Sequence, residues 1–194
     1  MKKKDIITGL VVILSITALS GYLLAQVYKI TKPRIDEQKK QEEQRLYKEI
    51  FPEGAEFVEE KEYVAVYDGN KNPIGRVYQI VQAGYGGPVV IKVGFDTEGK
   101  VKGVRILEQS ETPGLGAKIT EKTFLDQFSG KTGNELYLKK YNKEGKIDAI
   151  TGATISSRAV SEGILKLQEK IKLEKTADTV TGATTKEAGY EKTD

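Results

Sequence analysis

The chain has 194 residues, a length that suits one domain together with a membrane anchor. Its net charge of +3 is small, and its lysines are scattered between acidic residues, which argues against nucleic acid as a partner. The sequence contains neither Cys nor His, which excludes thiolate and imidazole metal sites, iron–sulfur ligands, disulfides and hydrolases that depend on a histidine base. Any redox role must therefore use an organic cofactor.

The first element in the chain is an uncharged apolar run from Ile6 to Val27. Its roughly 22 residues make a helix long enough to cross a hydrocarbon core at about 1.5 Å per residue, so residues 1–28 are predicted to be a transmembrane anchor. A cleaved signal peptide is the alternative, because Ala18-Leu19-Ser20 resembles a small-residue cleavage site, but the apolar run continues beyond it. Lysines flank both ends of the run, so the positive-inside rule leaves the orientation open.

A charged segment of good helix formers follows the anchor. Between Pro33 and Ile50 the sequence is dominated by Glu, Gln, Lys and Arg. Residues 29–55 are therefore predicted to be a stalk helix that joins the anchor to a domain, and its simplest role is that of a solvated spacer.

The pattern then changes to short β-rich runs separated by turn sequences such as Asp68-Gly69-Asn70. Connections this short join neighbouring strands, so the sheet is predicted to be largely antiparallel. The predicted strands are Tyr63–Tyr67, Ile74–Ala83, Val89–Phe95 and Val101–Leu107.

Helices are predicted after the sheet. A short one is expected at Glu121–Phe128, and apolar residues recur at helical spacing after Thr154. These apolar residues are Val160, Ile164, Leu167 and Ile171. Residues 56–174 are therefore predicted to form an α+β domain, in which helices cover one face of an antiparallel sheet, preceded by one N-terminal transmembrane helix. The tail from 175 to 194 lacks periodicity and is expected to be flexible.

The segment most suggestive of chemistry is Asp148–Ser157, with the sequence DAITGATISS, between the sheet and the amphipathic helix. Two small residues before Thr154 leave its hydroxyl open, and the helix that follows would direct free N–H groups towards an anion. A phosphate esterified to Thr154 would be well placed, with Ser156 and Ser157 as further donors and Arg158 as a charge. The alternative is an ordinary helix cap. No neighbouring residue activates Thr154, so a separate transferase would have to supply the catalysis.

Two glycine-containing loops are further candidates. In Ser110–Lys118 the pair Pro113-Gly114 fits a type II turn, and its glycines would let the backbone approach a flat ligand. In Gly84–Pro88 the aromatic ring of Tyr85 could stack on such a ligand. Taken singly, each is an ordinary loop, and neither is a dinucleotide-binding fingerprint.

Together, and in this order after an N-terminal anchor, these segments resemble the FMN-binding domain of the G subunit of the Rnf electron-transport complex. The C subunit of the Na⁺-translocating NADH:quinone reductase shares that domain. The resemblance rests on GYGGPV from Gly84 to Val89, on the stretch from Val93 to Gly116, and on DAITGATISS. It extends over nearly the whole chain, whose length favours the Rnf protein.

The resemblance implies that a Mg²⁺-dependent flavin transferase attaches FMN, drawn from FAD, to Thr154 by a phosphoester bond, with Asp148 in the recognition sequence. It implies an electron-carrying subunit, without turnover of its own, in a membrane complex that couples ferredoxin/NAD⁺ electron transfer to Na⁺ or H⁺ translocation. It also places the N-terminus in the cytoplasm and the FMN domain outside the cell membrane. The residues expected around the cofactor are Tyr85, Gly86, Glu111, Thr112, Gly114, Leu115, Gly116, Lys118, Thr151, Gly152, Ala153, Ser156 and Ser157.

A second copy of the D-x-x-T-G-A-T pattern runs from Asp178 to Thr184. It is followed by Thr185-Lys186 and by no amphipathic helix, so Thr184 is expected to be unmodified or only partly modified. Two other functions remain open at this point. A stand-alone extracytoplasmic FMN-dependent reductase would turn over with an added donor, and a non-redox membrane-tethered scaffold would purify without colour.

Overall fold

The computed structural model describes residues 3–187, and side chains from 9 to 174 together with Ile7. The chain divides into two compact units, α1 as far as Arg45 and a domain that begins at Leu46. Helix α1 (Lys3–Ile50) is continuous through Pro33, so the predicted anchor and stalk form one helix. Within it, Gly9–Ile50 is long and apolar enough to cross a membrane, and none of its most apolar stretch is buried among the described residues. The chain thus carries a candidate membrane span.

The domain is built on one five-stranded sheet in which every strand is antiparallel to its neighbour in sequence. The prediction of an antiparallel sheet is confirmed, and the four predicted strands are present. A fifth strand at the edge was not predicted. In order across the sheet, the strands are β1 (Glu56–Glu59), β2 (Tyr63–Tyr67), β3 (Pro73–Ala83), β4 (Pro88–Asp96) and β5 (Val101–Glu108).

Helices follow the sheet, as predicted. The segment expected at Glu121–Phe128 is a single turn of α-helix followed by a 3₁₀ turn. The helical backbone of α3 passes the predicted end at residue 174, and the flexibility of the tail stays a prediction. The second D-x-x-T-G-A-T copy falls in this part, where the side chains are outside the described residues. The elements are 3₁₀ helix η1 (Gly116–Thr120), α2 (Lys122–Leu125), η2 (Asp126–Phe128), η3 (Gly133–Leu136) and α3 (Thr154–Glu187).

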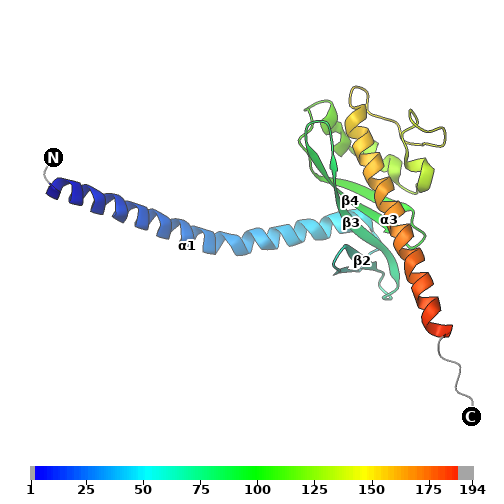
Figure 1. Ribbon diagram of the computed structural model, residues 1–194, viewed down its shortest axis with the longest axis horizontal. Coiled ribbons are helices and arrows are strands. Elements are labelled where there is room, and N and C mark those ends of the chain that lie inside the picture. The colour runs from blue at the N-terminus through cyan, green and yellow to red at the C-terminus, as the bar shows by residue number, and fades with distance from the viewer. Residues whose placement is uncertain (1–2, 188–194) are drawn as a thin grey trace, which may run out of the picture. The chain divides into compact units, whose positions relative to one another are not determined.

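The main core lies between α3 and one face of the sheet (Figure 1). Successive side chains of a strand point to opposite faces, so alternate residues of β4 turn inward, and all are nearly or fully buried. They belong to one cluster with Val160, Ile164 and Leu167 of α3, which confirms the apolar face predicted for this helix. The α+β class is confirmed. The inward β4 residues are Val89, Ile91, Val93 and Phe95.

The opposite face of the sheet is covered by the end of α1, which was not predicted. Ile50 and Phe51 are almost fully buried there, in a second cluster with Val77. Gly75 and Gly94 make room for them, because a Cβ atom at Gly75 would lie less than 3.0 Å from the Phe51 ring, and one at Gly94 would lie less than 3.0 Å from both side chains. The sheet is therefore buried on both faces.

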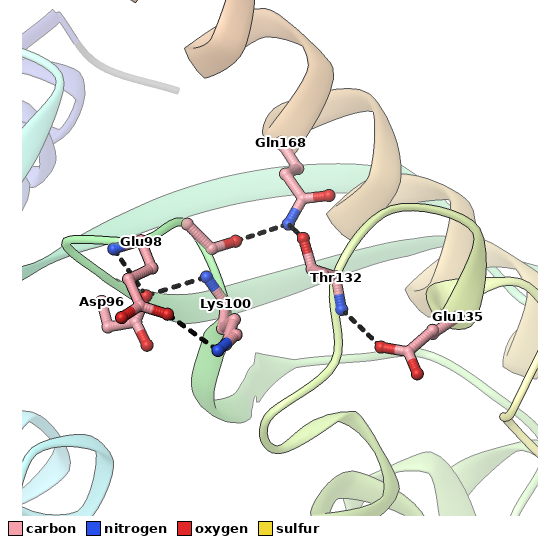
Figure 2. Close-up of polar contacts among 7 residues, drawn as sticks. Asp96, Glu98, Lys100, Thr132, Glu135 and Gln168 are labelled. Atoms are coloured by element: carbon pink, nitrogen blue, oxygen red, sulfur yellow. Dashed lines mark hydrogen bonds and ion pairs between the residues drawn. The ribbon is translucent and has the colours of Figure 1, made fainter.

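Gln168 ties α3 to the turn between β4 and β5 and to the loop before η3 (Figure 2). Its amide group donates to the Gly99 carbonyl at 2.6 Å and to the Thr132 hydroxyl at 3.0 Å, and its oxygen accepts from the Gly133 N–H at 2.7 Å. The Gly99 turn is itself fixed by Asp96, which accepts from backbone N–H groups on either side of it. The side chain of Gln168 is 3% exposed, so these bonds satisfy a buried polar group.

Candidate functional site

The three segments singled out in the sequence converge on one cavity of about 530 Å³. Its walls come from the loop after β3, the loop after β5 and the first turn of α3. A cavity of about 600 Å³ between β3 and α3 contains none of the predicted residues, so size alone would not have identified the site. The predicted residues that line the smaller cavity are Tyr85, Glu111, Thr112, Leu115, Gly116, Gly152, Ala153, Thr154 and Ser156.

Thr154 is the first residue of α3 and lies half-buried in the cavity wall. The chain turns into the helix at Gly152, whose φ of +79° lies in the left-handed region that favours glycine. The first helical hydrogen bond runs from the Ser157 N–H to the Ala153 carbonyl at 3.0 Å. The N–H groups of Thr154, Ile155 and Ser156 therefore have no helical acceptor. Free amides at a helix N-terminus form a site for an anion such as phosphate.

The hydroxyls of Ser156 and Ser157 are engaged inside the protein. Ser156 Oγ donates to Glu111 Oε2 at 2.6 Å. Ser157 Oγ donates to the Ala153 carbonyl at 2.9 Å and accepts from the Ile150 N–H at 3.0 Å. A hydroxyl has one proton to donate, so in this arrangement both serines fix the turn, and their contact with a phosphate stays a prediction.

The rim of the cavity is apolar. Tyr85 is 70% exposed, and Leu115 and Ile155 are about half exposed, although large apolar side chains are usually buried. Aromatic and aliphatic side chains that flank a hollow suit a flat aromatic ligand. The apolar rim therefore complements the free backbone amides at the start of α3.

Arg158, the charge predicted beside Thr154, makes its contacts outside the cavity. Arg158 is 3.7 Å from Glu162 Oε1, and its guanidinium lies 5.8 Å from the centre of the Tyr141 ring. Among the described residues that line the cavity there is neither Lys nor Arg. An anion bound here would be neutralised by backbone amides and the helix dipole.

Asp148 lies on the surface before the cavity, and its carboxylate is 2.6 Å from Lys139 Nζ. The side chain of Gln127 accepts from its N–H at 2.7 Å and donates to its carbonyl at 3.4 Å. Sequence reasoning did not identify Gln127 or Lys139, which lie 21 and 9 residues before Asp148 and outside the motif. The predicted site residues that do not line the cavity are Gly86, Gly114, Lys118, Thr151 and Ser157.

Comparison with known proteins agrees with this geometry. Residues 84–169 match the FMN-binding domain family, and that range contains the cavity-lining parts of all three segments. The G subunit of the proton-translocating ferredoxin:NAD(+) oxidoreductase complex of Clostridium ljungdahlii is 33% identical over 157 residues, covering 79% of this chain and 84% of the relative. The chain belongs to the G-subunit family of ion-translocating oxidoreductase complexes. The resemblance found in the sequence is thereby confirmed.

Another member of this family has a similar sequence identity and coverage. The G subunit of the Na(+)-translocating ferredoxin:NAD(+) oxidoreductase complex of Acetobacterium woodii is 33% identical, covering 77% of this chain and 83% of the relative. Among solved structures, the C subunit of the Na(+)-translocating NADH-quinone reductase of Parabacteroides distasonis has a TM-score of 0.45 and 25% identity, covering 57% of this chain and 61% of that one.

Proposed function

We propose that this protein is the electron-carrying, covalently flavinylated subunit of a membrane complex that couples ferredoxin/NAD⁺ electron transfer to the translocation of Na⁺ or H⁺. The names of its relatives support membership of such a complex, and the match to the FMN-binding domain family supports FMN as the cofactor. The observation that carries the proposal is the position of Thr154, at the start of α3 and in the wall of a cavity formed by two loops and the first turn of that helix.

The residues of the cavity fit FMN. The amides of the first turn of α3 would hold the phosphate, and the rim side chains Tyr85, Leu115 and Ile155 would flank the flavin ring. Bound FMN supplies the redox chemistry, which this chain, lacking Cys and His, cannot supply with metal–thiolate or haem–imidazole groups. The protein binds and orients the cofactor.

The covalent link proposed here is a phosphoester on Thr154. The Thr154 oxygen bonds to the phosphorus atom of the FMN half of FAD, the pyrophosphate bond breaks, and AMP leaves. The hydroxyl proton passes to a base of the flavin transferase, which also supplies the Mg²⁺. In this chain the small residues Gly152 and Ala153 keep the Thr154 hydroxyl accessible. The side chain of Asp148 is exposed and therefore available for recognition by the transferase.

Mass spectrometry of the full chain from a host with a flavin transferase tests this proposal. We expect the mass of one FMN less one water on the peptide that contains Thr154. We expect little or none on Thr184, because the backbone is helical at Gly182 but turns with a positive φ at Gly152. Similar occupancy at Thr184 would contradict the expected selectivity, and flavin on neither peptide would remove the basis for a redox function.

We also propose that α1 crosses the inner membrane once, with the N-terminus in the cytoplasm and the FMN domain outside. The apolar surface of α1 supports the span, and the resemblance supports the orientation. Since the chain has no Cys, single introduced cysteines can report the orientation. We expect Lys140→Cys, on the exposed surface of the domain, to react with an impermeant maleimide on spheroplasts, and Lys4→Cys to react only after lysis. The reverse pattern would invert the orientation.

A further inference from the structure

Glu111 is a buried carboxylate that links the three segments around the cavity. It is 5% exposed. Its Oε1 atom accepts from the N–H groups of Tyr85 at 2.8 Å and Gly86 at 3.2 Å, and its Oε2 atom accepts from Ser156 Oγ at 2.6 Å. One side chain from the loop after β5 thus holds both the loop after β3 and the first turn of α3.

The backbone around this carboxylate is shaped to admit it. A Cβ atom at Gly84 would lie less than 3.0 Å from Glu111 Oε1, and one at Gly116 would lie 2.6 Å from Oε2. The Glu111 N–H donates to Gln109 Oε1 at 2.6 Å, which fixes the backbone from which the side chain projects. Gly84 and Gly116, one from each candidate loop, therefore allow the Glu111 carboxylate to approach.

A carboxylate suits this position because both of its oxygens accept hydrogen bonds, whereas a carboxamide has one accepting oxygen. Burial of a charged group is costly unless hydrogen bonds compensate it, and three donors do so here. Hydrogen bonds to an ionised acceptor are also about twice as strong as neutral ones. The network is therefore a firm connection between segments that are 26 and 45 residues from Glu111 along the chain.

We propose that Glu111 is the positioning residue of the cavity. It sets the distance between the loop after β3 and the first turn of α3, and so the width of the space for the flavin ring. It also draws the Ser156 hydroxyl towards itself, which leaves the free amides at the start of α3 for the phosphate. The inference rests on the proposed function of the cavity as the flavin site.

The test compares Glu111→Ala with Gln168→Ala in the full chain, produced in a host with a flavin transferase. Gln168 is the matched control, because it is equally buried and makes three hydrogen bonds that tie two other loops to α3. None of the groups it bonds lines the flavin cavity. The readouts are the initial rate of flavinylation, the fluorescence anisotropy of the attached flavin and the thermal midpoint of unfolding.

We expect both variants to lose thermal stability, because each leaves buried groups unpaired. Only Glu111→Ala should slow flavinylation, by about tenfold or more, the equivalent of one or two lost buried hydrogen bonds. Flavin that is attached to this variant should have lower anisotropy, since the ring is less confined. Glu111→Gln should be intermediate, because its oxygen can accept from Tyr85 while its amide donates to the Ser156 oxygen.

Wild-type flavinylation and anisotropy in Glu111→Ala would overturn the inference and leave the proposed function intact. Equal losses in both readouts for Gln168→Ala, at a matched shift in midpoint, would also overturn it, because Glu111 would then act only through general stability. A wild-type chain that acquires no flavin would overturn the proposed function, and this inference with it.

Discussion

Thr154→Ala is expected to abolish covalent flavin on the chain and to reduce ferredoxin-dependent NAD⁺ reduction by membranes containing the complex to background. Alanine has no oxygen with which to form the phosphoester. The fold should persist, because the Thr154 side chain is only half-buried and alanine is the best helix former. Mass spectrometry measures the flavin, and circular dichroism of the same sample should match the wild type.

Two variants control this experiment. Thr154→Ser retains a hydroxyl and is expected to keep covalent flavin, although at a different rate. Thr123→Ala removes a threonine hydroxyl at an exposed residue outside both the motif and the cavity, and it should leave covalent flavin at the wild-type level. Flavin that persists in Thr154→Ala, or that moves to another residue with activity retained, would show that Thr154 is not the attachment site.

Gly75→Ala is expected to destabilise the domain by about 2–4 kcal/mol, in the range of severe overpacking. Its new Cβ atom would lie 2.5 Å from the Phe95 carbonyl oxygen and still closer to the Phe51 ring. The carbonyl belongs to the paired strand β4 and cannot move by a change of rotamer. Phe51 is 0% exposed, so its ring cannot turn into solvent to make room.

Urea denaturation of the full chain in detergent, followed by circular dichroism, measures this loss. Gly69→Ala is the control, because no atom lies within 4 Å of the Cβ position in that exposed turn. It should change the free energy of unfolding by less than about 0.5 kcal/mol. If the two variants were equally stable, the packing of Phe51 against Gly75 would be wrong.

The regular part of the fold was predictable where local pattern and burial agree. Tyr63–Tyr67 and the helix after Thr154 have the apolar spacing of a strand and of an amphipathic helix, and both were predicted at the right place. Strand β1 was missed because Glu56–Glu59 is four residues long and mostly exposed, so it lacks the alternation of a half-buried strand. Its pairing with β2 depends on tertiary structure.

The burial of Ile50 and Phe51 was not predictable for a related reason. The sequence places them at the end of a charged helix, and nothing local indicates that Gly75 and Gly94 leave room for them. The candidate site was limited in the same way. Taken singly, each of the three segments is an ordinary loop or helix cap. Only the resemblance to a family indicated that the three belong to one site. The bonds of Glu111 to Tyr85 and Ser156 join residues far apart in sequence, so no local signal reveals them.

The start of α3 also determines how Thr154 moves. Isolated helix ends fray, but a few residues beyond Thr154 this helix buries Val160 and Ile164 completely in the main core. Opening the first turn widely would disturb that core, so the hydrogen-bonded N–H of Ser157, unlike the three free amides before it, should exchange with solvent close to the rate set by global unfolding. A flavin attached to Thr154 would then move together with a stable part of the domain. Its fluorescence emission would change only when the whole domain unfolds.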